Sequence, residues 1–459
     1  MKKTSVKRIA EMIGAEMIAG HGDCEVTGVA TDSREVKPED IFFALIGENH
    51  DAHTFLEVVF ENGCRAAVVS DREAALRAAA DRDVTLLLTD DTVRAFQRLA
   101  KACIAQSSIK KLAVTGSVGK TSTRDILHAV MHTRYNTIKP EKNFNNEIGV
   151  PLTVFQIKDD TEAAVFEMGM ERLGEIRLLA DIVRPQTAVI TNVGTSHIET
   201  VGSRQAILQA KLEITDFFGP EDCLVIYNDG DILNKESAKG NYRLLTVGKD
   251  GNSDFIVSDI CNLGEKGVQF TIEHNYKTQR IKLPVPGEHN VYNAALAIAA
   301  ASQYGIGLEE AAAGVAAIKL TDKRLSVKGN HGIKVLDDTY NASPESMKAG
   351  IAALLSVAGL RRVAVLGDMF GLGGESERCH REVGLFVGES NLDLLITVGN
   401  YARYIGESAL PQMRGRTLHF DTKGEFLKEI DNIVQKGDVI LVKGSRGMKM
   451  EHIVKKILE

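Results

Sequence analysis

The stretch Leu112–Thr123, LAVTGSVGKTST, joins an apolar strand to a helix through a loop with two glycines. We expect the strand at 111–115 and the helix at 124–131. Glycines let the loop backbone turn so that successive N–H groups face an anion, and the helix N-terminus adds partial positive charge. Lys120 would reach the β- and γ-phosphates of a nucleotide, and the Thr121 hydroxyl could coordinate Mg²⁺. The pattern therefore predicts a phosphate-binding loop.

The spacing of this loop is shorter than that of the usual P-loop. The pattern G-x-x-x-x-G-K-[ST] would need a glycine where the chain has Val114, and the sequence instead reads G-x-x-G-K-T from Gly116 to Thr121. A chance glycine-rich turn is the alternative, but Lys-Thr directly after the second glycine favours nucleotide binding. The loop does not by itself distinguish a kinase, a GTPase switch, a motor and a ligase.

Length and composition limit the class of protein further. The chain has 459 residues, and about 150 residues per domain suggests roughly three domains. With 25% charged and 44% hydrophobic residues, it has a globular and not a disordered composition. The net charge of −7 argues against a broad nucleic-acid-binding surface.

The N-terminal segment and the cysteines favour a cytoplasmic protein. Glu11 and Glu16 interrupt any apolar run near the N-terminus, so we expect no secretory signal. The uncharged stretch 290–308 contains several polar residues and is expected to be a buried Ala-rich helix, not a membrane span. The six cysteines lie far apart without any CxxC, which predicts reduced thiols and neither a zinc site nor a disulfide framework.

Hydrophobic patterning divides the chain into three predicted α/β domains, 1–108, 109–320 and 321–459. The central one alternates short apolar strands with helices, which predicts a P-loop-type parallel sheet covered on both faces. Its segment 254–286 alternates apolar and polar residues, as antiparallel strands of a side sheet do. The third domain repeats the alternation and predicts a Rossmann-like doubly wound sheet. Strands are expected at 66–70, 85–89, 163–166, 187–191, 224–227, 333–336, 363–366, 394–398 and 439–442.

Polar residues follow several of these strands, at the edge where open α/β sheets bind ligands. Glu167 could ligate Mg²⁺ through its carboxylate oxygens, although a solvated loop residue is an equally good interpretation. His197 is a weaker candidate because imidazole is an unusual Mg²⁺ ligand, and a loop histidine bonded to the backbone is the alternative. Lys211 lies in a helical stretch, where an exposed lysine is the ordinary interpretation.

The third domain carries similar candidates. Asp337 and Asp338 end a strand and could bind magnesium, ribose hydroxyls or a cation, or could form a turn pair. Lys443 and Arg446 lie at a strand-to-helix turn suited to holding a carboxylate, with helix capping as the alternative.

Together these segments resemble the Mur ligases, the ATP-dependent amide-forming enzymes of peptidoglycan synthesis. The resemblance extends over nearly the whole chain and keeps the family's order. The matching segments are TDSR (31–34), DAH (51–53), TGSVGKTST (115–123), NFNNEIGVP (143–151), EMG (167–169), NVGTSHIE (192–199), QAKLEI (209–214), GEHNVYN (287–293), Arg324 and KGSRG (443–447).

Within the family, three segments resemble the branch that adds D-alanyl-D-alanine to UDP-N-acetylmuramoyl-tripeptide. They are DDTYNASPESM (337–347), GDMFGLG (367–373) with His380, and GDVILVKGSRGMKME (437–451). An Asp-Asn-Pro-Arg-like motif, typical of the ligase that adds the third peptide residue, is absent from the sequence. The chain departs from the family at Ala52, Ser343 and Gly371, where Gly, Asn and Glu are common.

The resemblance implies roles at the matching positions. Bound ATP would contact Gly116, Ser117, Val118, Gly119, Lys120, Thr121, Ser122, Asn290, Asn293, Arg324 and Asp338. The other substrates would contact Ser33, Arg34, Asn143, Asn146, Asn341, Lys443, Ser445 and Arg446. Two magnesium sites would involve Thr121, Glu167, His197 and Lys211, with Lys211 carbamylated so that a cation becomes an anionic oxygen donor. The catalytic residues would be Lys120, Lys211 and His197.

The resemblance also implies the reaction. ATP would phosphorylate the terminal carboxylate of UDP-N-acetylmuramoyl-tripeptide, and the amine of D-alanyl-D-alanine would attack the acyl phosphate. A monomer without nucleic-acid or membrane partners is expected. The third peptide residue, diaminopimelate or lysine, stays open. Two alternatives are a folylpolyglutamate synthase-like ligase, against which the 31–34 and 51–53 segments argue, and a P-loop regulatory NTPase that ligates nothing.

Overall fold

The computed structural model describes residues 1–47, 50–228, 231–318, 321 and 323–459. Its internal contacts divide the chain into two compact units. The first unit comprises Met1–Leu112, Tyr135–Met168 and Arg177–Pro185, and the second comprises Ala113–Arg134, Gly169–Ile176 and Gln186–Glu459. The three predicted domain ranges stay a prediction, and residue 320, at one of their boundaries, lies outside the described residues.

The first unit contains a small mixed α/β sheet with the strand order β2-β7-β6-β5-β4. Strands β4 to β7 run parallel, and β2 pairs with β7 antiparallel. The predicted strands at 66–70 and 85–89 are confirmed as β6 and β7. The elements are β1 (Thr4–Ser5), α1 (Val6–Ile13), β2 (Glu16–Ala19), β3 (Glu25–Val26), β4 (Gly28–Ala30), β5 (Asp40–Phe43), α2 (Leu56–Glu61), β6 (Ala66–Val69), α3 (Arg72–Ala78), β7 (Thr85–Leu88) and α4 (Thr92–Ala105).

The next part of the chain starts with β8 (Lys110–Thr115), through which the boundary between the units passes. Its short strands are fully or largely buried and rich in Ala, Val and Ile, as strands covered on both faces are. The elements that follow are α5 (Lys120–Met131), β9 (Thr137–Ile138), α6 (Gly149–Phe155), β10 (Ala163–Glu167), α7 (Glu175–Val183), β11 (Thr187–Ile190), α8 (Ile198–Val201), α9 (Arg204–Leu212) and β12 (Cys223–Tyr227).

The predicted antiparallel segment continues a parallel sheet and does not form a separate one. In the second unit β11, β12 and β13 (Arg243–Gly248) are parallel, and β13 pairs in parallel with the start of β14 (Phe255–Asn262) at Val247 and Phe255. Beyond β14 the pairing becomes antiparallel through β15 (Val268–His274) and β16 (Lys277–Leu283). The predicted antiparallel strands are therefore confirmed, and they extend the central sheet because β14 pairs with β13 along one edge and with β15 along the other.

The Ala-rich stretch forms the buried helix α10 (His289–Ser302), as expected, and the chain then turns into α11 (Leu308–Ala316). Within the described residues no helix is both long enough and apolar enough to cross a membrane.

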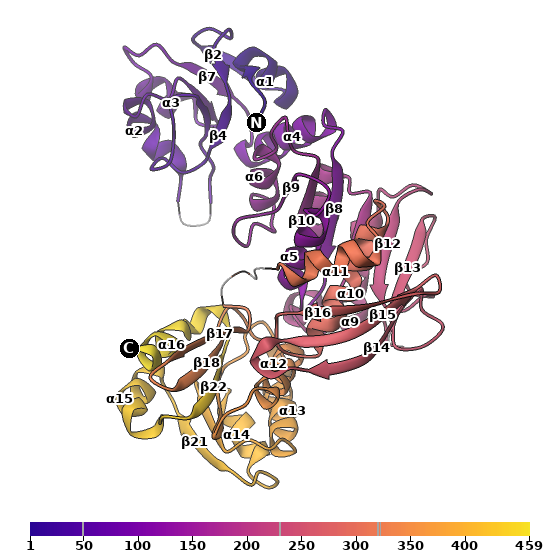
Figure 1. Cartoon of the computed structure of the whole chain (residues 1–459). Coiled ribbons are helices and arrows are strands. Elements are labelled where there is room, and N and C mark those ends of the chain that lie inside the picture. Colours follow the sequence, from indigo (N-terminus) through magenta and orange to yellow (C-terminus); the bar gives the residue numbers. More distant parts are fainter. Residues whose placement is uncertain (48–49, 229–230, 319–320, 322) are drawn as a thin grey trace. The chain divides into compact units, whose positions relative to one another are not determined.

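The C-terminal sheet has the order β17-β18-β22-β19-β20-β21, with only β17 antiparallel. Alternate side chains of its strands form two cores. Ala364 and Leu366 pack with α12, α13 and α14, whereas Val363 and Val365 pack with α15 and α16. Figure 1 shows this sheet in orange to yellow between those helices. The predicted doubly wound sheet is therefore confirmed.

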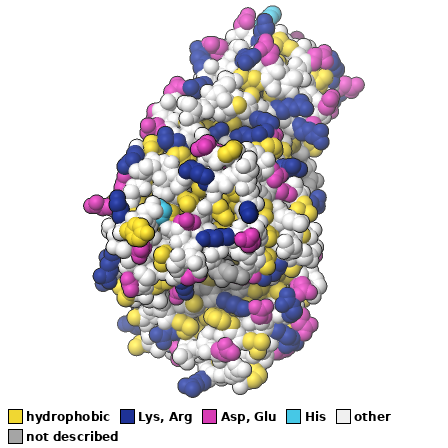
Figure 2. All heavy atoms as spheres, turned by 90° about the vertical axis from the view of Figure 1, so that its right-hand side faces the viewer, with side chains coloured by type: hydrophobic (Ala, Val, Ile, Leu, Met, Phe, Trp, Pro, Cys, Tyr) yellow, Lys and Arg dark blue, Asp and Glu magenta, His cyan; other side chains and the backbone are white. Residues whose placement is uncertain are grey.

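The elements of this part are β17 (Ser326–Asn330), β18 (Ile333–Asp338), α12 (Pro344–Ser356), β19 (Arg361–Gly367), α13 (Ser376–Gly388), β20 (Leu394–Val398), α14 (Arg403–Ala409), β21 (Arg416–Phe420), α15 (Lys423–Ile433), β22 (Asp438–Lys443) and α16 (Glu451–Leu458). The predicted strands of this part are confirmed, β20 with the predicted bounds and β18, β19 and β22 with slightly longer ones. Figure 2 shows basic and acidic side chains intermingled on the face it presents, without a continuous basic surface there.

Candidate active site

The phosphate loop needs its glycines for both conformation and space. Gly116 and Gly119 have φ values of 145° and 87°, which disfavour other residues. A Cβ on Gly116 would lie 1.9 Å from Oγ1 of Thr191, and one on Gly119 would lie 2.6 Å from Oδ1 of Asn293. Helix α5 begins at Lys120, directly after Gly119, and not at 124 as predicted. The Thr and Ser residues of its first turn favour turns over helix interiors, so the sequence pattern did not predict that the helix begins at Lys120.

A second loop, after β11, holds the phosphate loop in place. Ser117 N donates to the Asn192 carbonyl at 3.1 Å, and Val118 N donates to Asn192 Oδ1 at 3.0 Å. Gly194 N donates to Ser117 Oγ at 2.9 Å. The Lys120 ammonium folds back over the loop and donates to the Gly116 carbonyl at 2.7 Å. These bonds fix the loop backbone before any anion arrives.

Three titratable side chains of the second unit influence one another's charge, namely those of Lys120, His197 and Lys211. Burial, together with the positive charges of Lys120 and Lys211, lowers the pKa of His197 to about 4. Burial likewise lowers the pKa of Lys211 well below its ordinary value, assisted by Lys120. His197 sits in the left-handed backbone region, with φ of 64°. Lys211 is buried, Lys120 and His197 are half-buried, and the Lys120 ammonium supplies positive charge that suits an anionic ligand such as a polyphosphate.

Glu167, the remaining predicted metal ligand, belongs to the first unit. It ends β10, is 1% exposed, and accepts a hydrogen bond from Asn145 Nδ2 at 3.0 Å. Sequence reasoning missed Asn145, although it lies between the predicted Asn143 and Asn146. Both of those are exposed, and Asn146 Oδ1 accepts from Gly149 N at the start of α6.

The donor set fits magnesium only with added anionic oxygens. Among the described residues, no group of three or more His, Cys, Asp or Glu side chains is arranged to hold a metal ion. Thr121 offers a hydroxyl, and Lys211 is 3% exposed with no carboxylate ion-pair partner in the described part of the chain. A neutral buried amine is the form that reacts with CO₂, and a carbamate or nucleotide phosphates would supply the oxygens that Mg²⁺ prefers.

Asn290 and Asn293 lie on α10 directly behind the phosphate loop. Asn290 Nδ2 donates to the Pro286 carbonyl, and Asn293 Nδ2 donates to Asn290 Oδ1 at 3.0 Å. Both are buried. In this arrangement they support the loop through the close approach of Asn293 to Gly119.

Arg324 reaches the phosphate loop from the start of the C-terminal part. Its guanidinium donates to Thr121 Oγ1 at 3.2 Å and lies 4.0 Å from the ring centroid of Tyr340. Stacking on an aromatic ring orients a guanidinium while leaving its edge available to phosphate oxygens. Tyr340 was not predicted as a site residue, because the sequence does not show which side chain stacks on Arg324.

Asp338 and Lys443 form a buried ion pair across two neighbouring parallel strands. The Lys443 ammonium donates to Asp338 Oδ2 at 2.5 Å and to the Asn341 carbonyl at 2.9 Å. Burial lowers the pKa of Lys443, and the Asp338 carboxylate opposes that shift. Asp337 pairs with Lys328 at 2.8 Å. Both aspartates thus pair with a lysine, which is the cation interpretation, and Asp337 also forms the alternative turn by accepting hydrogen bonds from Thr339 N and Oγ1.

Replacing Asp338 with asparagine is expected to destabilise the chain by about 3–5 kcal/mol, because the buried Lys443 ammonium loses its counter-charge. Urea unfolding measures the change. The exposed Asp421→Asn variant is the matched control and should stay within about 0.5 kcal/mol of the parent chain. A loss below about 1 kcal/mol for Asp338→Asn would show that the pair does not stabilise this sheet.

The other predicted substrate residues are spread over both units. Ser445 Oγ accepts from Phe370 N at 2.8 Å, and Arg446 pairs with Glu451 at 2.7 Å. In the first unit the exposed Arg34 pairs with Asp32 at 2.5 Å, and the Ser33 carbonyl accepts from Asn62 at 3.3 Å. The remaining predicted residues Val118 and Ser122 belong to the phosphate loop and the first turn of α5, and Asn341 is exposed after β18.

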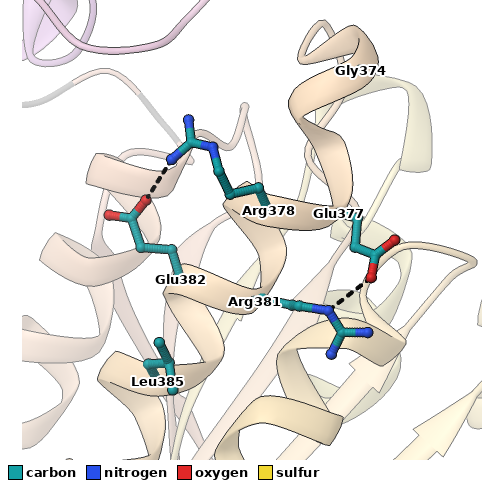
Figure 3. A pocket seen from close by; sticks show the side chains of 6 residues that line it. All are labelled: Gly374, Glu377, Arg378, Arg381, Glu382 and Leu385. Atoms are coloured by element: carbon teal, nitrogen blue, oxygen red, sulfur yellow. Dashed lines mark hydrogen bonds and ion pairs between the residues drawn. The ribbon is translucent and has the colours of Figure 1, made fainter.

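A pocket elsewhere lies on the outer face of α13. Figure 3 shows its ion pairs, Arg381 with Glu377 at 2.8 Å and Arg378 with Glu382 at 3.6 Å. None of the predicted site residues lines it. Its lining residues are Gly374, Glu377, Arg378, Arg381, Glu382 and Leu385.

The fold and the phosphate loop define an α/β nucleotide-binding protein, and comparison with known families is more specific. Residues 114–301 match the model of the Mur ligase middle domain, and residues 323–446 match that of the Mur ligase glutamate ligase domain. A curated relative from Bacillus subtilis (strain 168) is 40% identical, covering 100% of this chain and 99% of the relative. Its name is UDP-N-acetylmuramoyl-tripeptide–D-alanyl-D-alanine ligase. The chain belongs to the Mur ligase family.

Solved structures agree with this assignment. A crystal structure of MurF from Acinetobacter baumannii has a TM-score of 0.91 and 30% identity, covering 100% of this chain and 99% of that one. MurF ligase from Thermotoga maritima, solved in complex with ADP, has a TM-score of 0.81 and 28% identity over 94% of this chain and 96% of that one.

Proposed function

We propose that the chain joins D-alanyl-D-alanine to UDP-N-acetylmuramoyl-tripeptide in peptidoglycan precursor synthesis, converting ATP to ADP and phosphate. The observation that carries the proposal is the glycine loop with Lys120, His197 and Lys211 gathered beside it. The full-length relative that carries this activity in its name supports the choice of substrates. The ADP complex of the Thermotoga maritima protein supports ATP as the nucleotide.

The reaction needs two displacements. The terminal carboxylate of the tripeptide attacks the γ-phosphorus of ATP, the bond to ADP breaks, and an acyl phosphate forms. The dipeptide amine then attacks the acyl carbon, phosphate leaves, and the amide forms as the amine loses a proton. The loop N–H groups bind the phosphates, and Lys120 neutralises charge that develops on the transferring phosphoryl group.

Magnesium is proposed at two sites, formed by Thr121, Glu167, His197 and a carbamylated Lys211. When bound, Mg²⁺ neutralises phosphate charge and supports the in-line geometry of the transfer. A monomeric state and a cytoplasmic location complete the proposal, and sedimentation of the purified chain and cell fractionation test them.

Phosphate release distinguishes the proposed function from its alternatives. We expect release to require both UDP-N-acetylmuramoyl-tripeptide and D-alanyl-D-alanine, and parallel assays with diaminopimelate and lysine tripeptides identify the third residue. Release without either substrate would favour a regulatory NTPase. Activity with a folate and glutamate instead would favour a folylpolyglutamate synthase-like ligase.

A further inference from the structure

Glu345 connects the C-terminal sheet to the loop that holds the phosphate loop. It lies in the first turn of α12, which packs on the C-terminal core through Met347 and Ile351. Its Oε1 accepts hydrogen bonds from Thr195 N at 2.9 Å and from Thr195 Oγ1 at 3.1 Å. Thr195 belongs to the loop between β11 and α8. One carboxylate therefore joins two parts of the second unit that are distant in sequence.

The contact continues to the phosphate loop through backbone atoms. A Cβ on Gly194 would lie 2.6 Å from Glu345 Oε1, so only a glycine lets the carboxylate approach this closely. The Gly194 N–H in turn donates to Ser117 Oγ at 2.9 Å. His197, whose backbone is in the left-handed region, follows two residues after Thr195. A shift of Glu345 would thus be transmitted both to Ser117 and to His197.

The two oxygens of Glu345 differ in their surroundings. Oε2 is buried and, within the described residues, has no hydrogen-bond partner, whereas Oε1 has two. The N-terminus of α12 favours a negative charge at this position. A buried acceptor without a donor is costly. The contact of Glu345 with the loop is therefore favourable at Oε1 and unfavourable at Oε2.

We propose that Glu345 is a positioning residue for the ligation. By binding Thr195 it sets the 191–197 loop, and with it Ser117 and His197, in the arrangement used for phosphoryl transfer. The proposal rests on the proposed function and adds a residue that the family resemblance did not assign. Glu345 touches no reacting atom in this role.

Kinetics of four variants test the proposal. Glu345→Ala should lower kcat about tenfold or more, the size expected for losing a charged hydrogen-bond acceptor, with each KM changed less than about twofold. Glu345→Gln keeps an acceptor oxygen and should recover part of the loss. Thr195→Val should lower kcat less than Glu345→Ala, and adding it to Glu345→Ala should cause no further loss. Glu309→Ala, in the first turn of α11 and exposed, is the matched control and should keep the parental kcat.

Three outcomes would overturn the proposal. The first is a parental kcat in folded Glu345→Ala. The second is a double variant whose loss of kcat equals the product of the two single losses, because the two residues would then act independently. If Glu345→Ala does not fold, parental kcat values in both Glu345→Gln and Thr195→Val would overturn it equally. Ligation by the unmodified chain is measured before the variants. If the unmodified chain does not ligate, the proposed function is overturned, and this inference with it.

Discussion

Replacing Lys120 with alanine is expected to abolish ATP-dependent ligation, with a loss of at least about a thousandfold in kcat, while the chain stays folded. The Lys120 ammonium donates to the Gly116 carbonyl and lies over the phosphate loop, the place where phosphate charge develops. Alanine is a good helix former at the first position of α5, so the backbone should be preserved. Phosphate release with all three substrates measures the effect.

Two controls make the Lys120 result specific. Lys239→Ala removes an exposed lysine outside the site and should leave turnover unchanged. Thermal unfolding of Lys120→Ala should match that of the parent chain within a few degrees. Turnover retained by a folded Lys120→Ala variant would overturn the assignment of the loop as the catalytic phosphate site.

Replacing Lys211 with arginine should have the second-largest effect, a loss of at least about a hundredfold in kcat. Arginine keeps a positive charge but stays protonated, so it cannot form the carbamate that we propose as an oxygen donor for Mg²⁺. In the parent chain the buried position of Lys211 favours the neutral amine, whose lone pair attacks CO₂. Turnover at saturating Mg²⁺ measures the loss.

Carbon-13 NMR with labelled bicarbonate tests the carbamate directly. A carbamate signal is expected in the parent chain and not in Lys211→Arg. Burial lowers the folded-state pKa of Lys211 and so increases the share of neutral amine, and the carbamate signal should fall as the pH is lowered and the amine becomes protonated. Lys443 is also buried but is ion-paired with Asp338, whose carboxylate favours the charged amine, so a Lys443→Met variant should retain the signal. An unchanged signal in Lys211→Arg would contradict the carbamate.

Local sequence patterns determined most of the strands and the phosphate loop. The mostly apolar runs at 163–166, 187–191 and 394–398 each form a buried strand, because a strand covered on both faces needs largely apolar side chains. The two loop glycines were recognisable for a similar reason. Their backbone conformation is a property of a few consecutive residues.

Features that depend on distant partners were not predictable in this way. The pairing of β13 with β14 decides that the antiparallel strands extend the parallel sheet, and no residue in 254–286 encodes that neighbour. The sequence does not distinguish Asp338 from the neighbouring Asp337. In the structure Asp338 is the one that pairs with Lys443, which lies 105 residues away. Glu345 had no signal in the sequence, since its partner Thr195 lies 150 residues earlier.

The sequence by itself determined the position of the phosphate loop, because glycine spacing, Lys120 and a following helix N-terminus are all local. Only the tertiary structure decided which side chains surround that loop. Packing buries Lys211 without placing a carboxylate beside it among the described residues. It also brings Arg324 and Glu345 to loops far away in sequence. Burial and long-range contact arise from the packing of whole elements, so they could be read only after the sheets and helices were in place.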